Sequence, residues 1–186
     1  METPETERQE QGGNTAYANI PVVAEGEKDD YRDSGITSTV AIAGHPIHPA
    51  LVTLPIAFLV AAPASDIGYW LTSEPFWARA SFYLIAAGLA SGVLAALTGM
   101  LDLIRIKRVR ERKAGWAHAG LNILALGLTI LNLLLRWGEQ ETVTFPAGLM
   151  ISVVVALLLS VSAWYGAELI YRHKIAVIGY SSRSQS

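Results

Sequence analysis

The sequence predicts an all-α fold: a four-helix transmembrane bundle of two repeated helical hairpins, with a disordered N-terminal tail. Hydrophobic residues make up 52% of the chain and charged residues 16%, whereas a soluble domain carries about a quarter charged residues. The charges cluster and leave four long apolar segments, each near the 20 or so residues that cross a bilayer. Backbone polar groups in lipid must be satisfied within their own segment, so each is predicted to be a helix.

Residues 1–43 are predicted to be a disordered, acidic, cytoplasmic tail. Residues 1–44 carry nine acidic and three basic side chains and show no usable hydrophobic period. No basic stretch precedes a short apolar run, so a signal peptide is not expected. The four-helix transmembrane domain is expected over residues 44–178, followed by a short C-terminal tail over residues 179–186.

The helices are expected near residues 49–70, 76–104, 116–137 and 145–171. Tryptophan and tyrosine residues lie near their ends, as is typical of membrane interfaces. Gly88, Gly92 and Gly99 offer notches for close packing in the second helix. Pro55 and Pro63 are expected to kink the first.

The loop charges predict the orientation. The link between the second and third helices carries six bases, and the loops at the other end carry acids and no Lys or Arg. The positive-inside rule then places both termini in the cytoplasm, with the bacterial cytoplasmic membrane as the expected location. The bilayer is therefore the first expected partner, an anionic-lipid contact is a secondary expectation, and no motif indicates a nucleic acid.

The two outward-running helices begin alike and indicate a duplication. One begins His48-Pro49-Ala50-Leu51 and the other His118-Ala119-Gly120-Leu121. Each is followed by a returning helix that ends near a glycine and an acid, Asp102 or Glu168. We expect two parallel repeats of a helical hairpin, related by an axis along the membrane normal.

A spacing of 18 residues recurs in both outward helices. Asp66 follows His48 by 18 positions, and Arg136 follows His118 by 18 positions. Eighteen residues are five helical turns and about 27 Å of rise, so each pair shares a helix face. Asn122 and Asn132 fall near the same face as His118. Asp66 and Arg136 are predicted to form an ion pair near the outer surface; alternatively, both side chains reach to the headgroups.

The cytoplasmic ends of the helices concentrate polar side chains and allow three interpretations. His48 and His118 are candidate axial ligands of a b-type haem. Together with Asp102 and Glu168, they are candidate ligands of a divalent metal ion. In the third interpretation these residues cap helices, form ion pairs or handle protons, with no cofactor. The supporting residues of this layer are His45, Asn122, Arg105 and His173.

The prolines predict how the first helix begins. Pro49 suits a first helical turn, where its missing N–H costs nothing. It also disfavours the α conformation in the preceding residue, so His48 is expected at the N-cap or just before it. His45 is expected on the stiff, extended segment that precedes the helix, as a capping or supporting residue.

The run Gly44-His45-Pro46-Ile47-His48-Pro49-Ala50-Leu51-Val52 resembles the opening signature of the bacterial membrane proteins called domain of unknown function 2231. Further matches are Asp66, Gly99 with Asp102, His118-Ala119-Gly120-Leu121-Asn122, Arg136 and the run from Gly166 to Val177. The resemblance covers about residues 44–178. One departure is Lys174-Ile175-Ala176, where the family often has glycines.

This resemblance implies a four-helix integral membrane domain and no established activity. Relatives occur joined to cytochrome c-like or Rieske-like redox modules, and such domains have been likened to four-helix b-type cytochromes. The resemblance thus points toward electron transfer. Besides the bilayer, a redox protein or a second copy of the chain (a homo-oligomer) is the expected partner.

The favoured function is therefore b-type haem or metal binding in membrane electron transfer. The alternative is a non-enzymatic membrane subunit or assembly factor with a structural inner polar layer. A third hypothesis is a small transporter or proton relay. The chain has no cysteine, which excludes disulfides, thiolate metal sites and iron–sulfur ligation by cysteine. No nucleophile with a partnered base is evident, so hydrolysis is not expected. Whether the chain is an enzyme stays open.

Overall fold

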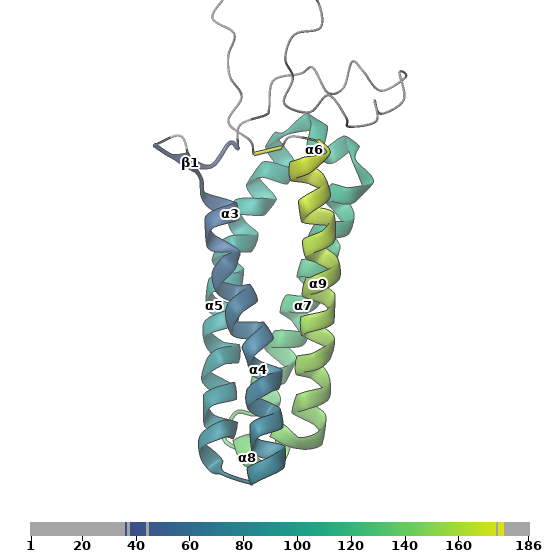
Figure 1. Cartoon of the computed structure of the whole chain (residues 1–186). Coiled ribbons are helices and arrows are strands. Elements are labelled where there is room, and N and C mark those ends of the chain that lie inside the picture. Colours follow the sequence, from purple (N-terminus) through teal and green to yellow (C-terminus); the bar gives the residue numbers. More distant parts are fainter. Residues whose placement is uncertain (1–35, 37, 44, 174, 177–186) are drawn as a thin grey trace, which may run out of the picture. The chain divides into compact units, whose positions relative to one another are not determined.

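A computed structural model of the chain describes residues 36, 38–43, 45–173, 175 and 176. Most of the predicted N-terminal tail (residues 1–35) and the predicted C-terminal tail lie outside the described residues. The described residues belong to one compact unit, Ser34–Ser186. The fold class predicted from the sequence is confirmed: four long helices run side by side (Figure 1).

Each element begins and ends close to where the apolar pattern places it. A short hairpin, β1 (Ala41–Ile42) and β2 (His45–Pro46), leads into α3 (Ile47–Leu51) and α4 (Thr53–Thr72). The helix α5 (Pro75–Arg105) returns, and α6 (Lys107–Glu111) forms the link to α7 (Lys113–Leu135). The chain then passes through α8 (Gln140–Val143) and a wider helical turn, η2 (Thr144–Gly148), into α9 (Leu149–Tyr171).

The first span is interrupted at Val52, between α3 and α4. Pro55 lies four residues after Leu51 and has no N–H to donate to the Leu51 carbonyl, which accounts for a break at this point. His48 lies inside α3, as its second residue, and Pro46 is the N-cap. The expected position of His48 outside the helix was therefore wrong: Pro49 restricts the preceding residue, but the restriction is overcome here.

The four long helices form two hairpins that pack against each other. The helix α4 packs most extensively on α5, and α7 on α9; α5 also contacts α7, and α4 contacts α9. Gly88 and Gly92 of α5 receive the side chains of Leu59 and Leu126, so each notch holds a leucine. One apolar cluster lies in the middle of the bundle, around Leu59, and another lies at the α6 end, around Val109.

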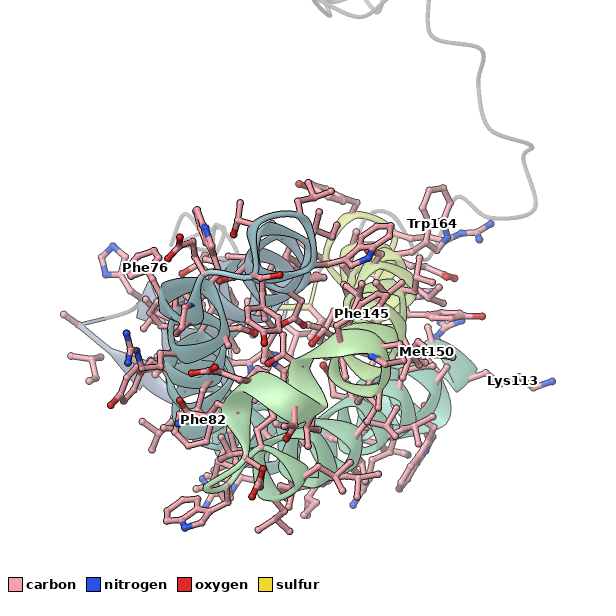
Figure 2. The ribbon with its side chains drawn as sticks, turned by 90° about the horizontal axis from the view of Figure 1, so that it is seen from below. Phe76, Phe82, Lys113, Phe145, Met150 and Trp164 are labelled. Atoms are coloured by element: carbon pink, nitrogen blue, oxygen red, sulfur yellow. The ribbon has the colours of Figure 1, made fainter. Side chains whose placement is uncertain are left out.

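The outer surface of the helices is apolar. Met150 and Trp164 have 66% and 76% of their surface exposed, and Figure 2 shows both at the periphery of the helices. A contiguous apolar surface of this kind is unfavourable in water and is what lipid contact requires. Four spans are long and apolar enough to cross a membrane: Ile47–Thr72, Pro75–Arg105, Lys113–Leu135 and Gln140–Tyr171.

Candidate functional site

His48 is held in one orientation by the neighbouring helix α5. Its Nδ1 donates a hydrogen bond to the Ala95 carbonyl oxygen (2.8 Å). The ring lies against Gly99, where an added Cβ would come within 2.7 Å of the ring Cε1. Only glycine leaves room for the imidazole at this point, so backbone and ring together fix the position of His48.

His118 has the same arrangement in the second hairpin. Its Nδ1 donates to the Ser162 carbonyl oxygen of α9 (2.8 Å). An added Cβ on Gly166 would come within 3.1 Å of the ring Cε1. The histidine, the carbonyl acceptor and the glycine thus recur as a unit in both hairpins.

The repeat extends along the whole bundle with constant offsets. In the returning helices, Ala95 and Gly99 correspond to Ser162 and Gly166, an offset of 67 positions. In the first helix of each hairpin the offset is 70: buried positions 55, 59, 62 and 66 of α4 correspond to buried positions 125, 129 and 132 of α7 and to buried position 136. The same faces of both hairpins are therefore buried, as expected for two parallel repeats.

Two pairs of equivalent residues contact each other across the repeats. The His48 and His118 rings lie 6.2 Å apart between centroids, at an interplanar angle of 89°. Asp66 and Arg136 form an ion pair, as described below. Two positions related by a rotation axis can be close together only if both lie near that axis. Both pairs therefore lie near the local axis that relates the two repeats.

The hydrogen bonds determine which ring nitrogen carries the proton when each histidine is neutral. A carbonyl oxygen only accepts, so Nδ1 of His48 and of His118 must carry the proton. In the neutral ring, Nε2 then presents a lone pair. This is the arrangement of metal-ligating histidines, whose second nitrogen usually donates to a carbonyl or carboxylate.

Asn122 makes the two histidines unequal. Its side-chain amide donates to the Ser162 hydroxyl (2.7 Å) and the His118 carbonyl (2.8 Å), and lies 3.2 Å from His118 Nε2. The corresponding residue in the first repeat is Val52, which has no such donor. The His118 lone pair is therefore engaged by Asn122.

The two acids proposed as metal ligands do not join the histidines. Asp102 accepts hydrogen bonds from the Ser38 hydroxyl (2.6 Å), the Thr39 hydroxyl (2.7 Å) and the Thr39 main-chain N–H (2.8 Å). Glu168 lies 3.7 Å from Arg172 on its own helix. Within the part of the chain that the structure describes, no three His, Asp or Glu side chains gather as a metal site.

The remaining predicted residues of the inner layer lie outside the histidine pair. His45 is exposed in β2, and its Nδ1 lies 3.0 Å from the Ala43 carbonyl. Arg105 is the exposed last residue of α5. His173 follows α9, where its main-chain N–H donates to the Glu168 carbonyl (3.3 Å).

Asp66 and Arg136 form a bidentate ion pair with both side chains fully buried. Arg136 Nη1 lies 2.7 Å from Asp66 Oδ1, and Nη2 lies 2.9 Å from Oδ2. Neither side chain has exposed surface, so the alternative in which both reach to the headgroups does not describe this structure. Two parallel hydrogen bonds between ionised groups are among the strongest in proteins.

Four neutral side chains complete the surroundings of Arg136. Its Nε donates to Asn132 Oδ1 (2.9 Å), Nη1 also donates to Ser81 (2.9 Å) and Thr144 (3.3 Å), and Nη2 to Ser152 (3.3 Å). Of these, sequence reasoning placed only Asn132 on the right face. The missed signal was that a buried guanidinium needs acceptors for all its N–H groups, which serines and threonines in apolar helices supply.

A model of the family described as "Predicted membrane protein (DUF2231)" matches residues 44–179. The chain belongs to this family. The match covers both histidines, the ion pair and all four spans, so the resemblance seen in the sequence is confirmed. Comparisons with curated proteins and with solved structures gave no match.

This DUF2231 chain thus offers two polar centres with different chemistry. The ion pair is saturated with hydrogen bonds, which suits it to holding the hairpins together. The histidine pair offers two partly exposed imidazoles, each oriented by a hydrogen bond from Nδ1 to a main-chain carbonyl. Of the two, the histidine pair is the one whose atoms can bind a ligand.

Proposed function

We propose that His48 and His118 are the two axial ligands of a b-type haem and that the protein takes part in membrane electron transfer. The observation that carries this proposal is the shared tautomer: both Nδ1–H groups donate to main-chain carbonyls, so that Nε2 of each ring would be the atom to bind iron. Two imidazoles from facing helices of a bundle are the ligand set of such a haem.

The separation of the rings is compatible with ligation of one iron. Metal–imidazole nitrogen bonds are about 2.0–2.1 Å long, so two rings on opposite sides of one metal have centroids about 6 Å apart. The His48 and His118 centroids are 6.2 Å apart. Ligation requires Asn122 to release Nε2 of His118, and its bonds to Ser162 and the His118 carbonyl remain available to it.

The size of the donor set favours haem over a bare metal ion. A bare zinc or iron ion in a protein is usually held by three or four side chains. Here Asp102 is engaged by Ser38 and Thr39, and Glu168 faces Arg172. Two imidazoles suffice for haem, because the macrocycle supplies the other four nitrogens.

A bound haem would supply one-electron chemistry. The chain itself would set the iron's surroundings: Ala95 and Ser162 orient the rings through their carbonyls, and Gly99 and Gly166 fix the depth of each ring. The apolar bundle would keep water from the site, and a redox protein or a second copy of the chain would exchange the electron.

We also place the histidine pair at the cytoplasmic side of a bacterial membrane. Support comes from the bases between α5 and α7, at the same end of the bundle as α3 (Figure 1), because basic loops stay in the cytoplasm. Electron exchange would then occur with a cytoplasmic or inner-leaflet partner.

The visible spectrum tests the proposal. The full-length protein, expressed with a haem precursor and purified in mild detergent, is expected to show a Soret band and, on reduction, sharp α and β bands. His48→Ala and His118→Ala are each expected to lose these bands. His45→Ala is the matched control, because the His45 side chain is exposed and hydrogen bonds to the Ala43 carbonyl in the segment before α3, and it should keep the full spectrum.

A second function is favoured by a separate observation. Among the described residues, no buried side-chain nitrogen or oxygen lacks a hydrogen-bond partner, and Asn122 already occupies His118 Nε2. A polar layer complete in itself suits a non-enzymatic membrane subunit or assembly factor. A folded, colourless wild-type protein that also lacks bound metal would select this second function.

A further inference from the structure

The link between α5 and α7 presents four exposed bases on a folded support. These are Arg105, Lys107, Arg110 and Lys113, here called the basic platform. Figure 2 shows Lys113 extending away from the helices. The inference below is independent of the proposed haem, since none of these side chains contacts the histidine pair in the structure.

The platform is anchored from beneath by apolar packing. Val109, in the middle of α6, is 5% exposed and packs in the cluster that includes Leu103, Ile106 and Ala114. Gly115 lies so close to it that an added Cβ would come within 2.7 Å of the Val109 carbonyl oxygen. The positive-inside rule requires only that a cytoplasmic loop carry basic residues. It does not explain why these bases lie on a packed, folded support.

The platform lies where two spans end. The span of α5 ends at Arg105 and that of α7 begins at Lys113. Trp116 is 58% exposed, and its indole N–H donates to the Arg110 carbonyl (2.9 Å), which ties an interfacial aromatic ring to the platform. At this depth the abundant anions are lipid phosphates.

The platform has little internal neutralisation. Glu111 lies 3.7 Å from Lys107, with side chains 61% and 81% exposed, and such exposed pairs are weak. The buried acid in the last turn of α5, Asp102, is engaged by Ser38 and Thr39. Within the part of the chain that the structure describes, the positive charges of the platform are therefore available to an external anion.

We propose that the basic platform binds the phosphate groups of anionic lipids. Arginine supplies a planar fork that meets phosphate oxygens in pairs, and lysine adds a point charge. Four bases on a support held at headgroup depth form a shallow cationic surface. The bound lipids would form an anionic annulus around this end of the protein.

Spin-labelled lipids provide the test. The full-length protein is reconstituted into phosphatidylcholine bilayers with a trace of spin-labelled phosphatidylglycerol or spin-labelled phosphatidylcholine, and the protein-bound fraction of each label is measured. The wild type is expected to prefer the anionic label. Lys107→Gln with Arg110→Gln is expected to lower that preference roughly fivefold or more.

Two control variants separate site from total charge. Arg79→Gln removes an exposed base near the other end of α5 and should leave the preference unchanged. Lys107→Arg with Arg110→Lys keeps the charge and should keep the preference. Equal preference in the double Gln variant and in Arg79→Gln overturns the proposal.

Circular dichroism and size-exclusion chromatography show whether the double Gln variant folds. If it does not, the salt dependence of the wild-type lipid preference provides the test. The wild-type preference should then vanish as sodium chloride rises toward about 1 M, where exposed charges are screened within roughly 3 Å. A preference that persists in high salt would come from a contact other than these exposed bases and would overturn the proposal.

Discussion

Equivalent residues of the two repeats meet in two places, and the two meetings differ in kind. His48 and His118 are identical, and each is held by its own carbonyl and glycine. Asp66 and Arg136 are complementary. Identical residues at an axis give a symmetric pair of imidazoles, whereas opposite charges give a specific ion pair between the hairpins.

The ion pair is expected to contribute strongly to stability. Arg136→Met or Asp66→Leu alone should lower the free energy of unfolding by about 3–5 kcal/mol, because each leaves an uncompensated buried charge. The double variant should lose much less than the sum. Unfolding in mixed detergent micelles measures all three, and strictly additive losses would show that the two residues are not coupled.

Gly148 is expected to be required by the same ion pair. An added Cβ on Gly148 would meet the Arg136 guanidinium, so Gly148→Ala should lower the free energy of unfolding by about 1–3 kcal/mol. Gly127 has no neighbour within 4 Å of an added Cβ. Gly127→Ala should therefore be neutral or stabilising by up to about 1 kcal/mol. Equal effects of the two substitutions would count against this packing.

At the scale of the elements, the segment before α3 is held against the long helix α5. Ser38 and Thr39 donate three hydrogen bonds to Asp102 of α5, and the Ile47 main-chain N–H donates to the Val40 carbonyl (3.0 Å). These contacts, with the β1–β2 hairpin, fix how the chain enters α3. They lie within ten residues of His48 and so support its position.

Removal of this tie is expected to loosen the segment without unfolding the bundle. Asp102→Ala should raise amide hydrogen exchange over residues 38–43 by at least about tenfold, because each hydrogen bond to a charged group contributes about 1.5–3 kcal/mol. Glu168→Ala is the matched control, since its contact is with Arg172 on its own helix. Unchanged exchange in Asp102→Ala would mean that the segment is held by other contacts.

The elements were predictable where a single physical rule decides them. Apolar length predicted four spans, and the 18-residue spacing brought Asp66 and Arg136 to one depth. The partners of Asp102 were not predictable, because Ser38 and Thr39 lie in a stretch whose composition resembles a tail. The backbone at Phe145 is extended, with φ −127° and ψ 133°, as expected for a residue that precedes a proline, so the start of the last helix could have been predicted after this residue.

At the scale of the whole molecule, the histidine pair and the ion pair lie at opposite ends of the helix bundle. Between them lies the apolar cluster around Leu59, Ala125, Val155 and Leu159. Such a layer separates the histidine pair from the ion pair in this structure, which suits two separate polar centres better than a continuous polar path.

The absence of native cysteine makes the orientation directly measurable. Lys107→Cys is expected to react with a membrane-impermeant maleimide only after cells are opened, because α6 is proposed to face the cytoplasm. Gln140→Cys, at the start of α8, is expected to react in intact cells. Reaction of both in intact cells, or the reverse pattern, would refute the proposed orientation.

Electron paramagnetic resonance of the oxidised, full-length protein addresses the histidine pair most directly. The rings lie at 89° to each other, and if a bound ferric haem were held by both rings in this orientation, two iron d orbitals would be almost equal in energy. We expect a highly anisotropic low-spin ferric signal that is absent from folded His48→Ala and His118→Ala and present in His45→Ala. A folded wild-type protein with no ferric signal, or a signal unchanged in both alanine variants, would contradict ligation by this pair.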